Sequence, residues 1–254
     1  MIYDCVPFFN ELDILKLRMQ IMAPYVDFFV IEEASVTFSG EPKRMIFAEN
    51  RQLFAEFEEK IRYVAVENSP LEGVTTHERD KFQKNQLIRG LSDCRPEDII
   101  IFSDVDEIPN PKTLVRLIEA FEPGKVYHLA QRMFYCFLNM EEVSGNLLSI
   151  TGEFPGVERR QWLGTKICSF AELPEEGIVY LREVPPEDQR GRRVAFRLYG
   201  RRRRAGCGEA YRCESAGGGP FRIQYQTLFK RGGGQAALRR GYFRPGRKVC
   251  AGSD

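Results

Sequence analysis

Residues 98–109 constrain the fold of this chain more than any other stretch, because an apolar run leads straight into a group of acids. The stretch reads Asp-Ile-Ile-Ile-Phe-Ser-Asp-Val-Asp-Glu-Ile-Pro, and residues 99–102 are the apolar run. A continuous run of this length is typical of a strand buried on both faces, as in a parallel sheet covered by helices. Pro109 ends the strand, since proline has no backbone N–H to give to a sheet.

The acids at the end of this strand predict a cation site. Side chains two residues apart point to the same side of an extended chain, so Asp104 and Asp106 should leave the strand together. Paired carboxylates suit hard cations such as Mg²⁺ or Mn²⁺, and open α/β sheets bind ligands at the carboxyl ends of their strands. The alternative is an acidic turn without a ligand, and an Asp-x-Asp pair alone also occurs in phosphatases and nucleotidyltransferases.

Strand-like and helix-like segments alternate along most of residues 1–189. Besides the central strand, we predict strands at residues 2–6, 26–32, 60–66, 126–130 and 133–138. We predict helices at residues 11–22 (with Asn10 as the cap), 51–59, 75–91 and 111–121. This alternation predicts an α/β fold, in which a mostly parallel sheet of the Rossmann type is flanked by helices.

Length and cysteine use narrow the class of protein. The 254 residues suffice for one large domain or two small ones. No apolar stretch reaches the roughly 18 to 20 residues of a membrane helix. The 7 cysteines are scattered without zinc spacing, and the first residues show no signal-peptide pattern. We therefore expect a cytoplasmic protein with no transmembrane segment, or one held peripherally at the inner face of the membrane.

The composition changes near residue 190. Residues 190–254 hold 15 Arg and 2 Lys against 2 Glu and 1 Asp, a net charge of +14, together with 13 of the 22 glycines. Residues 1–189 carry a net charge of −13. We therefore expect a domain at residues 1–189 and a basic Gly/Arg-rich tail at residues 190–254, which its composition predicts to be disordered. The tail offers nucleic-acid binding as an alternative function, although we do not expect it.

Several short motifs follow one another along the acidic part of the chain. They are Ile2-Tyr3-Asp4-Cys5, Phe9-Asn10-Glu11-Leu12-Asp13, Val30-Ile31-Glu32-Glu33, Thr37-Phe38-Ser39-Gly40 with Lys43, Glu78-Arg79-Asp80 with Gln83 and Asn85, and Ser103-Asp104-Val105-Asp106-Glu107-Ile108-Pro109. In this order they resemble glycosyltransferase family 17, and the resemblance covers residues 1–189. It implies a GT-A-like fold and inverting transfer of a sugar, foremost N-acetylglucosamine, from a UDP-sugar donor to a hydroxyl of a glycan acceptor.

The resemblance also implies roles for single residues. Asp104 and Asp106 would hold Mn²⁺ or Mg²⁺ against the leaving diphosphate, and Glu107 would complete the catalytic group by orienting a ligand of the metal or the sugar. The residues expected to bind the nucleotide sugar are Asn10, Glu33, Arg79, Asn85 and Arg89. The two arginines would add positive charge to the diphosphate. Alternatives remain open: a helix cap for Asn10, a loop cap for Glu33, and surface ion pairs for the arginines.

The family pattern continues with Gly-Trp-His-Phe, a motif that this chain lacks. Residues 192–196 read Arg-Arg-Val-Ala-Phe instead. Codons can be chosen for them that spell Gly-Gly-Trp-His-Phe when read one base later. We therefore hypothesise that the sequence after about Gln189 is an out-of-frame translation of a family C-terminus. This chain would then be a truncated, catalytically impaired homologue, which is one alternative to an active enzyme. A metal-dependent nucleotidyltransferase is a separate alternative.

Overall fold

The computed structural model describes residues 1–70, 72–134, 141–142 and 161–184, and the backbone of four short strands beyond them. The strands are β1 (Ile2–Phe8), β2 (Phe28–Ala34), β3 (Ile61–Val66), β4 (Ile99–Phe102), β5 (Tyr127–Arg132), β6 (Gln161–Ser169), β7 (Ala195–Arg197), β8 (Tyr211–Glu214), β9 (Gln224–Phe229) and β10 (Ala237–Tyr242). The α-helices are α1 (Leu12–Met22), α2 (Ile46–Glu49), α3 (Thr76–Asn85) and α4 (Pro111–Glu119). The 3-10 helices are η1 (Arg51–Lys60), η2 (Gln86–Leu91), η3 (Phe170–Glu172) and η4 (Ile178–Arg182).

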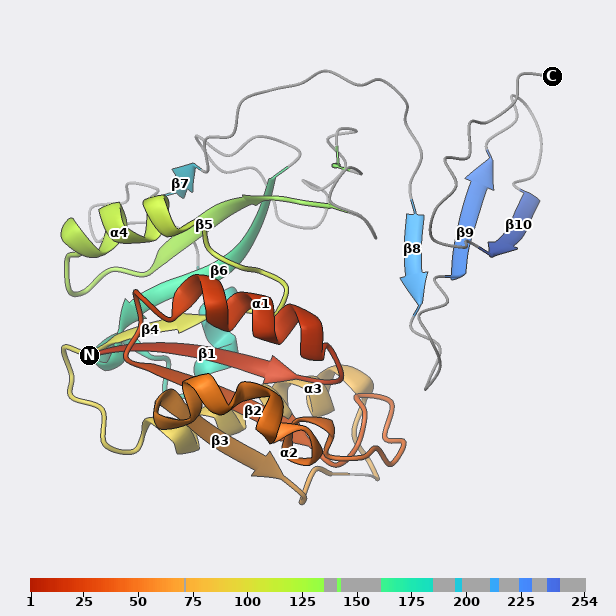
Figure 1. The fold of residues 1–254 in the computed structure, drawn as a ribbon, viewed down its shortest axis with the longest axis horizontal. Helices are drawn as coiled ribbons and strands as arrows, with labels where there is room; N and C mark the ends of the chain where they lie inside the picture. The colour runs from red at the N-terminus through yellow and green to blue at the C-terminus, as the bar shows by residue number, and fades with distance from the viewer. Residues whose placement is uncertain are drawn as a thin grey trace.

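One sheet, in the order β3-β2-β1-β4-β6-β5-β7, carries the fold (Figure 1). β1 pairs in parallel with β2 and β4, and β2 pairs in parallel with β3, so this half is the predicted Rossmann-type arrangement. β6 then pairs antiparallel with both β4 and β5. The predicted α/β fold is confirmed. The strand order reverses between β1 and β4, and ligands of such sheets bind at the carboxyl ends of the strands at this point.

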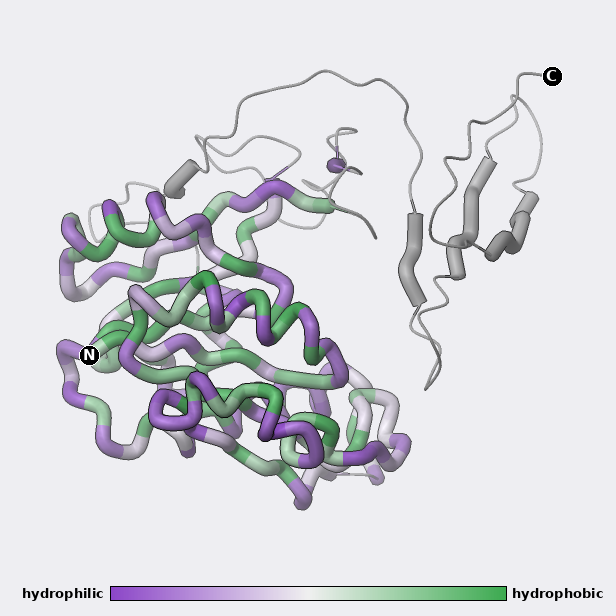
Figure 2. Tube along the Cα trace, viewed as in Figure 1, coloured by the Kyte–Doolittle hydropathy of each residue, from purple (hydrophilic) through white to green (hydrophobic). Residues whose placement is uncertain are grey.

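Alternating side chains of the strands form two apolar layers, one on each face of the sheet. On β1, Val6 and Phe8 belong to one layer, whereas Tyr3 and Cys5 belong to the other. The first layer is covered by α1, α2, η1 and α4, and the second by η2 and η4. Hydrophobic residues therefore follow the central strands, and hydrophilic ones gather in the loops and outer helix turns (Figure 2).

The structure corrects several local predictions. Asn10 does not cap α1: Glu11 holds the cap position, and its carboxylate accepts the backbone N–H groups of Phe9 and Asn10 at 3.2 and 3.0 Å. The helix predicted at residues 75–91 is α3 followed by the tighter η2. η2 lies so close to β2 that a Cβ on Gly90 would stand 2.4 Å from a side-chain methyl of Val30.

Two predictions fall wholly or largely outside the described residues. The strand predicted at residues 133–138 is described only at its first two positions. In the tail, the structure gives the backbone of β7, which pairs with β5, and of β8, β9 and β10, which form a separate sheet. The domain boundary near residue 190 and the out-of-frame origin of the tail stay predictions. Of the helices in the described residues, none has the length and apolar character needed to cross a membrane.

Candidate functional site

The residues that follow β4, here called the acidic loop (residues 103–107), leave the sheet where its strand order reverses. The side chain of Asp104 is 38% exposed, whereas that of Glu107 is 10% exposed. Asp106 is exposed, and Val105 between them is buried in the apolar layer beneath α1. The loop therefore presents two carboxylates to solvent at the predicted ligand-binding edge.

A fully buried arginine of α1 holds the acidic loop. Arg18 binds both carboxylate oxygens of Asp4 on β1, at 2.8 and 2.6 Å, and neither side chain is exposed. It also donates to the hydroxyl of Ser103 at 2.7 Å and to the carbonyl oxygens of Asp104 and Glu107 at 3.1 and 3.3 Å. Because the guanidinium offers five N–H donors in a rigid fork, one side chain ties β1, α1 and the loop together.

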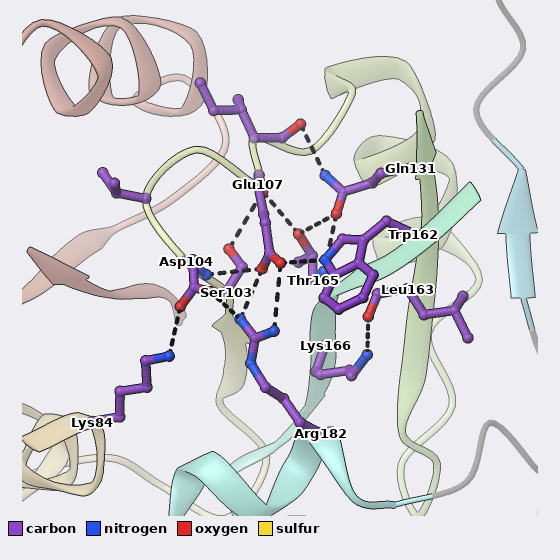
Figure 3. Close-up of polar contacts among 12 residues, drawn as sticks. Lys84, Ser103, Asp104, Glu107, Gln131, Trp162, Leu163, Thr165, Lys166 and Arg182 are labelled. Carbon is purple, nitrogen blue, oxygen red and sulfur yellow. Dashed lines mark hydrogen bonds and ion pairs between the residues drawn. The ribbon is translucent and has the colours of Figure 1, made fainter. Parts of the chain in front are cut away.

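Glu107 closes the acidic loop onto β6 (Figure 3). Its carboxylate accepts hydrogen bonds from the backbone N–H of Asp104, at 2.9 Å, and from the indole N–H of Trp162, and it pairs with Arg182 at 2.9 Å. Gly164 permits this approach, because a Cβ there would stand 2.7 Å from the carboxyl carbon of Glu107. Both oxygens are thus bound by protein groups, and the predicted part of Glu107 in orienting a ligand stays a prediction.

β5 and β6 support the same loop through their polar side chains (Figure 3). The hydroxyl of Thr165 donates to the carbonyl oxygen of Glu107 at 2.9 Å. The amide of Gln131 donates to the carbonyl oxygen of Ile108 at 3.2 Å and accepts the backbone N–H of Thr165 at 3.0 Å. The loop is therefore fixed by contacts from both of its sides.

Two positively charged side chains form ion pairs with Asp104 (Figure 3). Lys84 of α3 lies 3.1 Å from one carboxylate oxygen, and Arg182 at the end of η4 lies 3.1 Å from the other. Lys84 also pairs with Asp80, one helical turn earlier, at 3.0 Å. Burial acts to lower the pKa of Lys84, but Asp104 and Asp80 outweigh it and leave this pKa raised.

Sequence reasoning missed both cations. The only local signal for Lys84 is its spacing of four residues from Asp80, which marks an ion pair on many helices. Arg182 has no local signal, because its partners lie 75 or more residues away in the chain. Only the antiparallel return of β6 and the turn that follows it bring this residue to the acidic loop.

Asn85 fixes the element that carries Arg182. Its side-chain oxygen accepts the backbone N–H of Val179 at 3.0 Å, at the beginning of η4. Gly177 has a φ of +128°, and a Cβ there would stand 2.3 Å from the same oxygen, so this turn requires glycine. Two adjacent residues of α3 therefore determine both positive charges at Asp104. Lys84 supplies one charge itself, and Asn85 positions η4, which carries Arg182. The predicted contact of Asn85 with a nucleotide sugar stays a prediction.

Asp106 is the candidate metal ligand of the acidic loop whose side chain is exposed to solvent. Although the residue is exposed, its pKa is raised, first by partial desolvation and then by the negative charges of Glu107 and Asp104, which a bound cation would offset. Within the described ranges, no three His, Cys, Asp or Glu side chains converge on a metal position. Mg²⁺ is commonly held by one or two carboxylates together with substrate phosphates, so these residues fit a metal shared with a phosphate ligand.

The remaining predicted contacts of the nucleotide sugar lie against protein groups or in solvent. Glu33 is buried and accepts the hydroxyl of Tyr63 at 2.9 Å and the ammonium of Lys43 at 3.3 Å. Arg79 donates to two loop carbonyl oxygens at 2.7 and 2.6 Å, and Arg89 donates to a carbonyl oxygen of β3 at 2.9 Å. Asn10 is exposed in the turn after β1. Their roles in binding a nucleotide sugar stay predictions.

Glu32 points to the other face of β2 and is nearly inaccessible, with 2% of its surface exposed. One of its carboxylate oxygens has no hydrogen-bond partner within the described part of the chain. Burial raises the pKa of Glu32 to about 8, an effect that Lys43 and Lys84 oppose and Glu33 and Asp80 reinforce. Glu32 is therefore largely protonated at neutral pH.

Glu32→Gln should stabilise the protein in alkaline solution only. The folded state keeps the proton of Glu32 up to about pH 8, whereas the unfolded state loses it near pH 4.5, so this group lowers the free energy of unfolding as pH rises between those values. The advantage of the variant over wild type should grow from near zero at pH 5 to a few kcal/mol at pH 9. Urea unfolding at both pH values measures it, with the exposed Glu56→Gln as control. An advantage of equal size at both pH values would contradict the assignment.

Comparisons with known proteins bear on this site. The model of a protein family described as "Glycosyltransferase family 17" matches residues 1–144. The β-1,4-mannosyl-glycoprotein 4-β-N-acetylglucosaminyltransferase of Rattus norvegicus is 25% identical over 171 residues, which cover 60% of this chain and 32% of the relative. The Homo sapiens protein of the same name is 26% identical over 149 residues, covering 54% and 28%. The matched part thus spans about a third of the length of these relatives.

Two solved structures share a distant overall likeness. The 2-C-methyl-D-erythritol 4-phosphate cytidylyltransferase of Francisella tularensis is 10% identical, with 77% of this chain and 89% of that chain covered and a TM-score of 0.41. Glucosyl-3-phosphoglycerate synthase of M. tuberculosis is 18% identical, with 81% and 73% covered and a TM-score of 0.40. Likenesses at these TM-scores support no conclusion about the chemistry of this chain.

Proposed function

This chain belongs to glycosyltransferase family 17, and we propose that it transfers a sugar, N-acetylglucosamine in the first instance, from a UDP-sugar to a hydroxyl of a glycan. The transfer inverts the configuration at the anomeric carbon and uses Mn²⁺ or Mg²⁺. The relatives that match it are named for N-acetylglucosamine transfer to a mannosyl-glycoprotein, which supports the choice of sugar.

The observation that carries the proposal is the acidic loop at the reversal of strand order, with Lys84 and Arg182 beside it. A nucleotide-sugar donor reacts by releasing an anionic nucleoside diphosphate, so its site must stabilise negative charge as the glycosidic bond breaks. Carboxylates that hold a divalent cation, next to fixed positive charges, meet this need. A plain acidic turn would not require a lysine and an arginine on the two oxygens of one aspartate.

Each part of the site has a role in this proposal. Asp106, together with Asp104, would hold the metal, which supplies Lewis-acid stabilisation of the leaving diphosphate. Arg18 and Glu107 keep the acidic loop in one conformation, so that the carboxylates need no rearrangement when the donor binds. The glycan acceptor must present its hydroxyl to the anomeric carbon on the side opposite the diphosphate, because the reaction inverts.

Calorimetric titration with nucleotides tests the proposal. We expect UDP and UDP-N-acetylglucosamine to bind in the presence of Mn²⁺ and to lose most of their affinity in EDTA, whereas GDP should bind weakly in either. UDP release from UDP-N-acetylglucosamine should rise when a mixture of mannose-containing oligosaccharides is added.

A variant gene with the alternative reading frame restored after Gln189 serves as the matched comparison. If that frame encodes a missing part of the site, the restored protein should bind UDP more tightly than this chain. If neither folded protein binds a uridine nucleotide with Mn²⁺ present, the proposal is wrong. Circular dichroism establishes in each case that the protein under test is folded.

A further inference from the structure

Lys84 and Arg182 occupy the two oxygens of Asp104 that a metal would need. Lys84 lies 3.1 Å from one oxygen, and Arg182 lies 3.1 Å from the other. The lysine is buried, with 8% of its surface exposed, and so cannot simply turn away into water. A divalent cation can therefore bind Asp104 only if these two side chains weaken their contacts with it.

The charges around the acidic loop are unbalanced. The carboxylates are Asp80, Asp104, Asp106 and Glu107, and the cations that pair with them are Lys84 and Arg182. Four negative and two positive charges leave an excess of negative charge, to which Glu11 adds near Asp106 and which a bound divalent cation would reduce. Lys166 offsets this excess only in part, since burial, with Arg182 second, lowers its pKa to about 7.

The guanidinium of Arg182 has an N–H group that could donate a hydrogen bond to a further ligand. Its Nη2 serves Asp104 and Glu107, at 3.1 and 2.9 Å, whereas its Nε is buried and donates no hydrogen bond to any group in the described ranges. An unused N–H donor on a guanidinium is costly to bury and is well shaped for a phosphate oxygen.

We propose that Lys84 and Arg182 are the diphosphate-binding residues of this site and that they exchange partners when the donor arrives. Asp104 passes from these two cations to the metal, and the cations pass to the phosphate oxygens. The inference rests on the proposed function, because it presupposes a metal and a nucleoside diphosphate. It replaces the predicted Arg79 and Arg89, which donate to carbonyl oxygens, with two buried or half-buried cations that already face the acidic loop.

This exchange gives metal and nucleotide a mutual dependence. Metal alone must compete with two cations for Asp104, and nucleotide alone must compete with Asp104 for the cations, so each should bind weakly by itself. Once both are present, Asp104 faces the metal, the two cations face phosphate oxygens, and metal and diphosphate attract each other, so each ligand strengthens the binding of the other by the same factor.

Arg182→Gln should therefore change two affinities in opposite directions. Without nucleotide, Mn²⁺ should bind the variant several-fold more tightly than wild type, because Asp104 has lost a competitor. With saturating Mn²⁺, UDP should bind the variant about tenfold or more weakly, because a charge-assisted contact with phosphate is lost. Electron paramagnetic resonance of free Mn²⁺ measures the first affinity, and calorimetry with UDP measures the second. Lys84→Gln should behave in the same way.

Two ion-paired residues away from the acidic loop provide matched controls. Lys125→Gln removes a lysine that pairs with Glu122, and Arg51→Gln removes an arginine of η1 that pairs with Glu58. Neither change should alter either affinity. Arg182→Lys keeps a charge but loses the planar fork, so its UDP affinity should lie between those of wild type and Arg182→Gln.

The outcomes separate this inference from the proposed function. If wild type binds UDP with Mn²⁺ but folded Arg182→Gln and Lys84→Gln bind UDP equally well, the inference is wrong and the proposed function stands. If both variants lose Mn²⁺ and UDP affinity together, partner exchange is also wrong. If wild type itself binds no uridine nucleotide, the proposed function has failed. Thermal unfolding shows which variants are folded. If Arg182→Gln or Lys84→Gln does not fold, the other variant and Arg182→Lys still test the inference.

Discussion

Arg18→Met is expected to lower the free energy of unfolding by roughly 3 to 5 kcal/mol. The substitution leaves Asp4 fully buried without its counter-ion, and an unpaired buried charge is among the most expensive defects in a protein. It also removes the hydrogen bonds that Arg18 gives to the acidic loop. Because domains of this kind are stable by only about 5 to 15 kcal/mol, the loss consumes a large share of the total.

Urea unfolding of wild type, Arg18→Met and the double variant Asp4→Leu/Arg18→Met measures this effect. Replacing both members of a buried pair by apolar residues removes the uncompensated charge, so the double variant should recover much of the lost stability. Arg51→Met, which breaks the pair with Glu58 at the surface, should stay close to wild type. A single variant as stable as wild type would show that Asp4 finds another partner.

The double variant also separates folding from function. It should fold, yet its acidic loop lacks the donors that bind the carbonyl oxygens of Asp104 and Glu107. We therefore expect its affinity for UDP with Mn²⁺ to be lower than that of wild type. Wild-type affinity in the double variant would mean that Arg18 stabilises the fold without shaping the site.

Asp106→Ala should lower the rate of sugar transfer by roughly a hundred-fold to ten-thousand-fold. A metal that stabilises the leaving diphosphate contributes several kcal/mol to the transition state, and each 1.4 kcal/mol is about tenfold in rate. Asp106 is the more exposed of the two proposed metal ligands, and the other, Asp104, is already paired with Lys84 and Arg182. UDP release with an oligosaccharide acceptor, assayed over a range of Mn²⁺ concentrations, measures the effect.

Stability distinguishes the loss of a ligand from the loss of the fold. Asp106 is exposed and is repelled by Glu107 and Asp104, so removing its charge should leave the unfolding midpoint unchanged or slightly raised. Glu119→Gln, at an exposed acid of α4, should change neither rate nor stability. If Asp106→Ala transfers sugar as fast as wild type at every Mn²⁺ concentration, Asp106 is not a metal ligand.

The central strand and its acidic end could be predicted because their signals are local. An apolar run bounded by acids and a proline defines β4 within the printed sequence, and the structure gives Ile99–Phe102 with the same bounds. The start of the helix predicted from residue 75 is also a local feature, because the capping box of Thr75 and Glu78 that begins α3 lies within one helical turn. Both features depend on neighbours that the chain itself places side by side.

The partners of the acidic loop could not be predicted, because they depend on contacts between distant segments. Arg182 reaches Asp104 only through the antiparallel pairing of β6 with β4. The two glutamates at the end of β2 show the same limit. Both faces of this strand are buried, so alternation alone did not reveal that Glu33 faces Tyr63 while Glu32 lies on the side of α3.

Helix α3 carries Lys84 and Asn85 at its last turn, and so a single helical register sets the position of both cations at the acidic loop. Inserting or deleting one residue within it would rotate everything beyond by about 100° and move both groups at once. Substitutions can adjust such a site one contact at a time, whereas a change in length cannot. We expect the length of this segment to be held fixed among functional descendants of this chain, even where the surface loops around it grow or shrink.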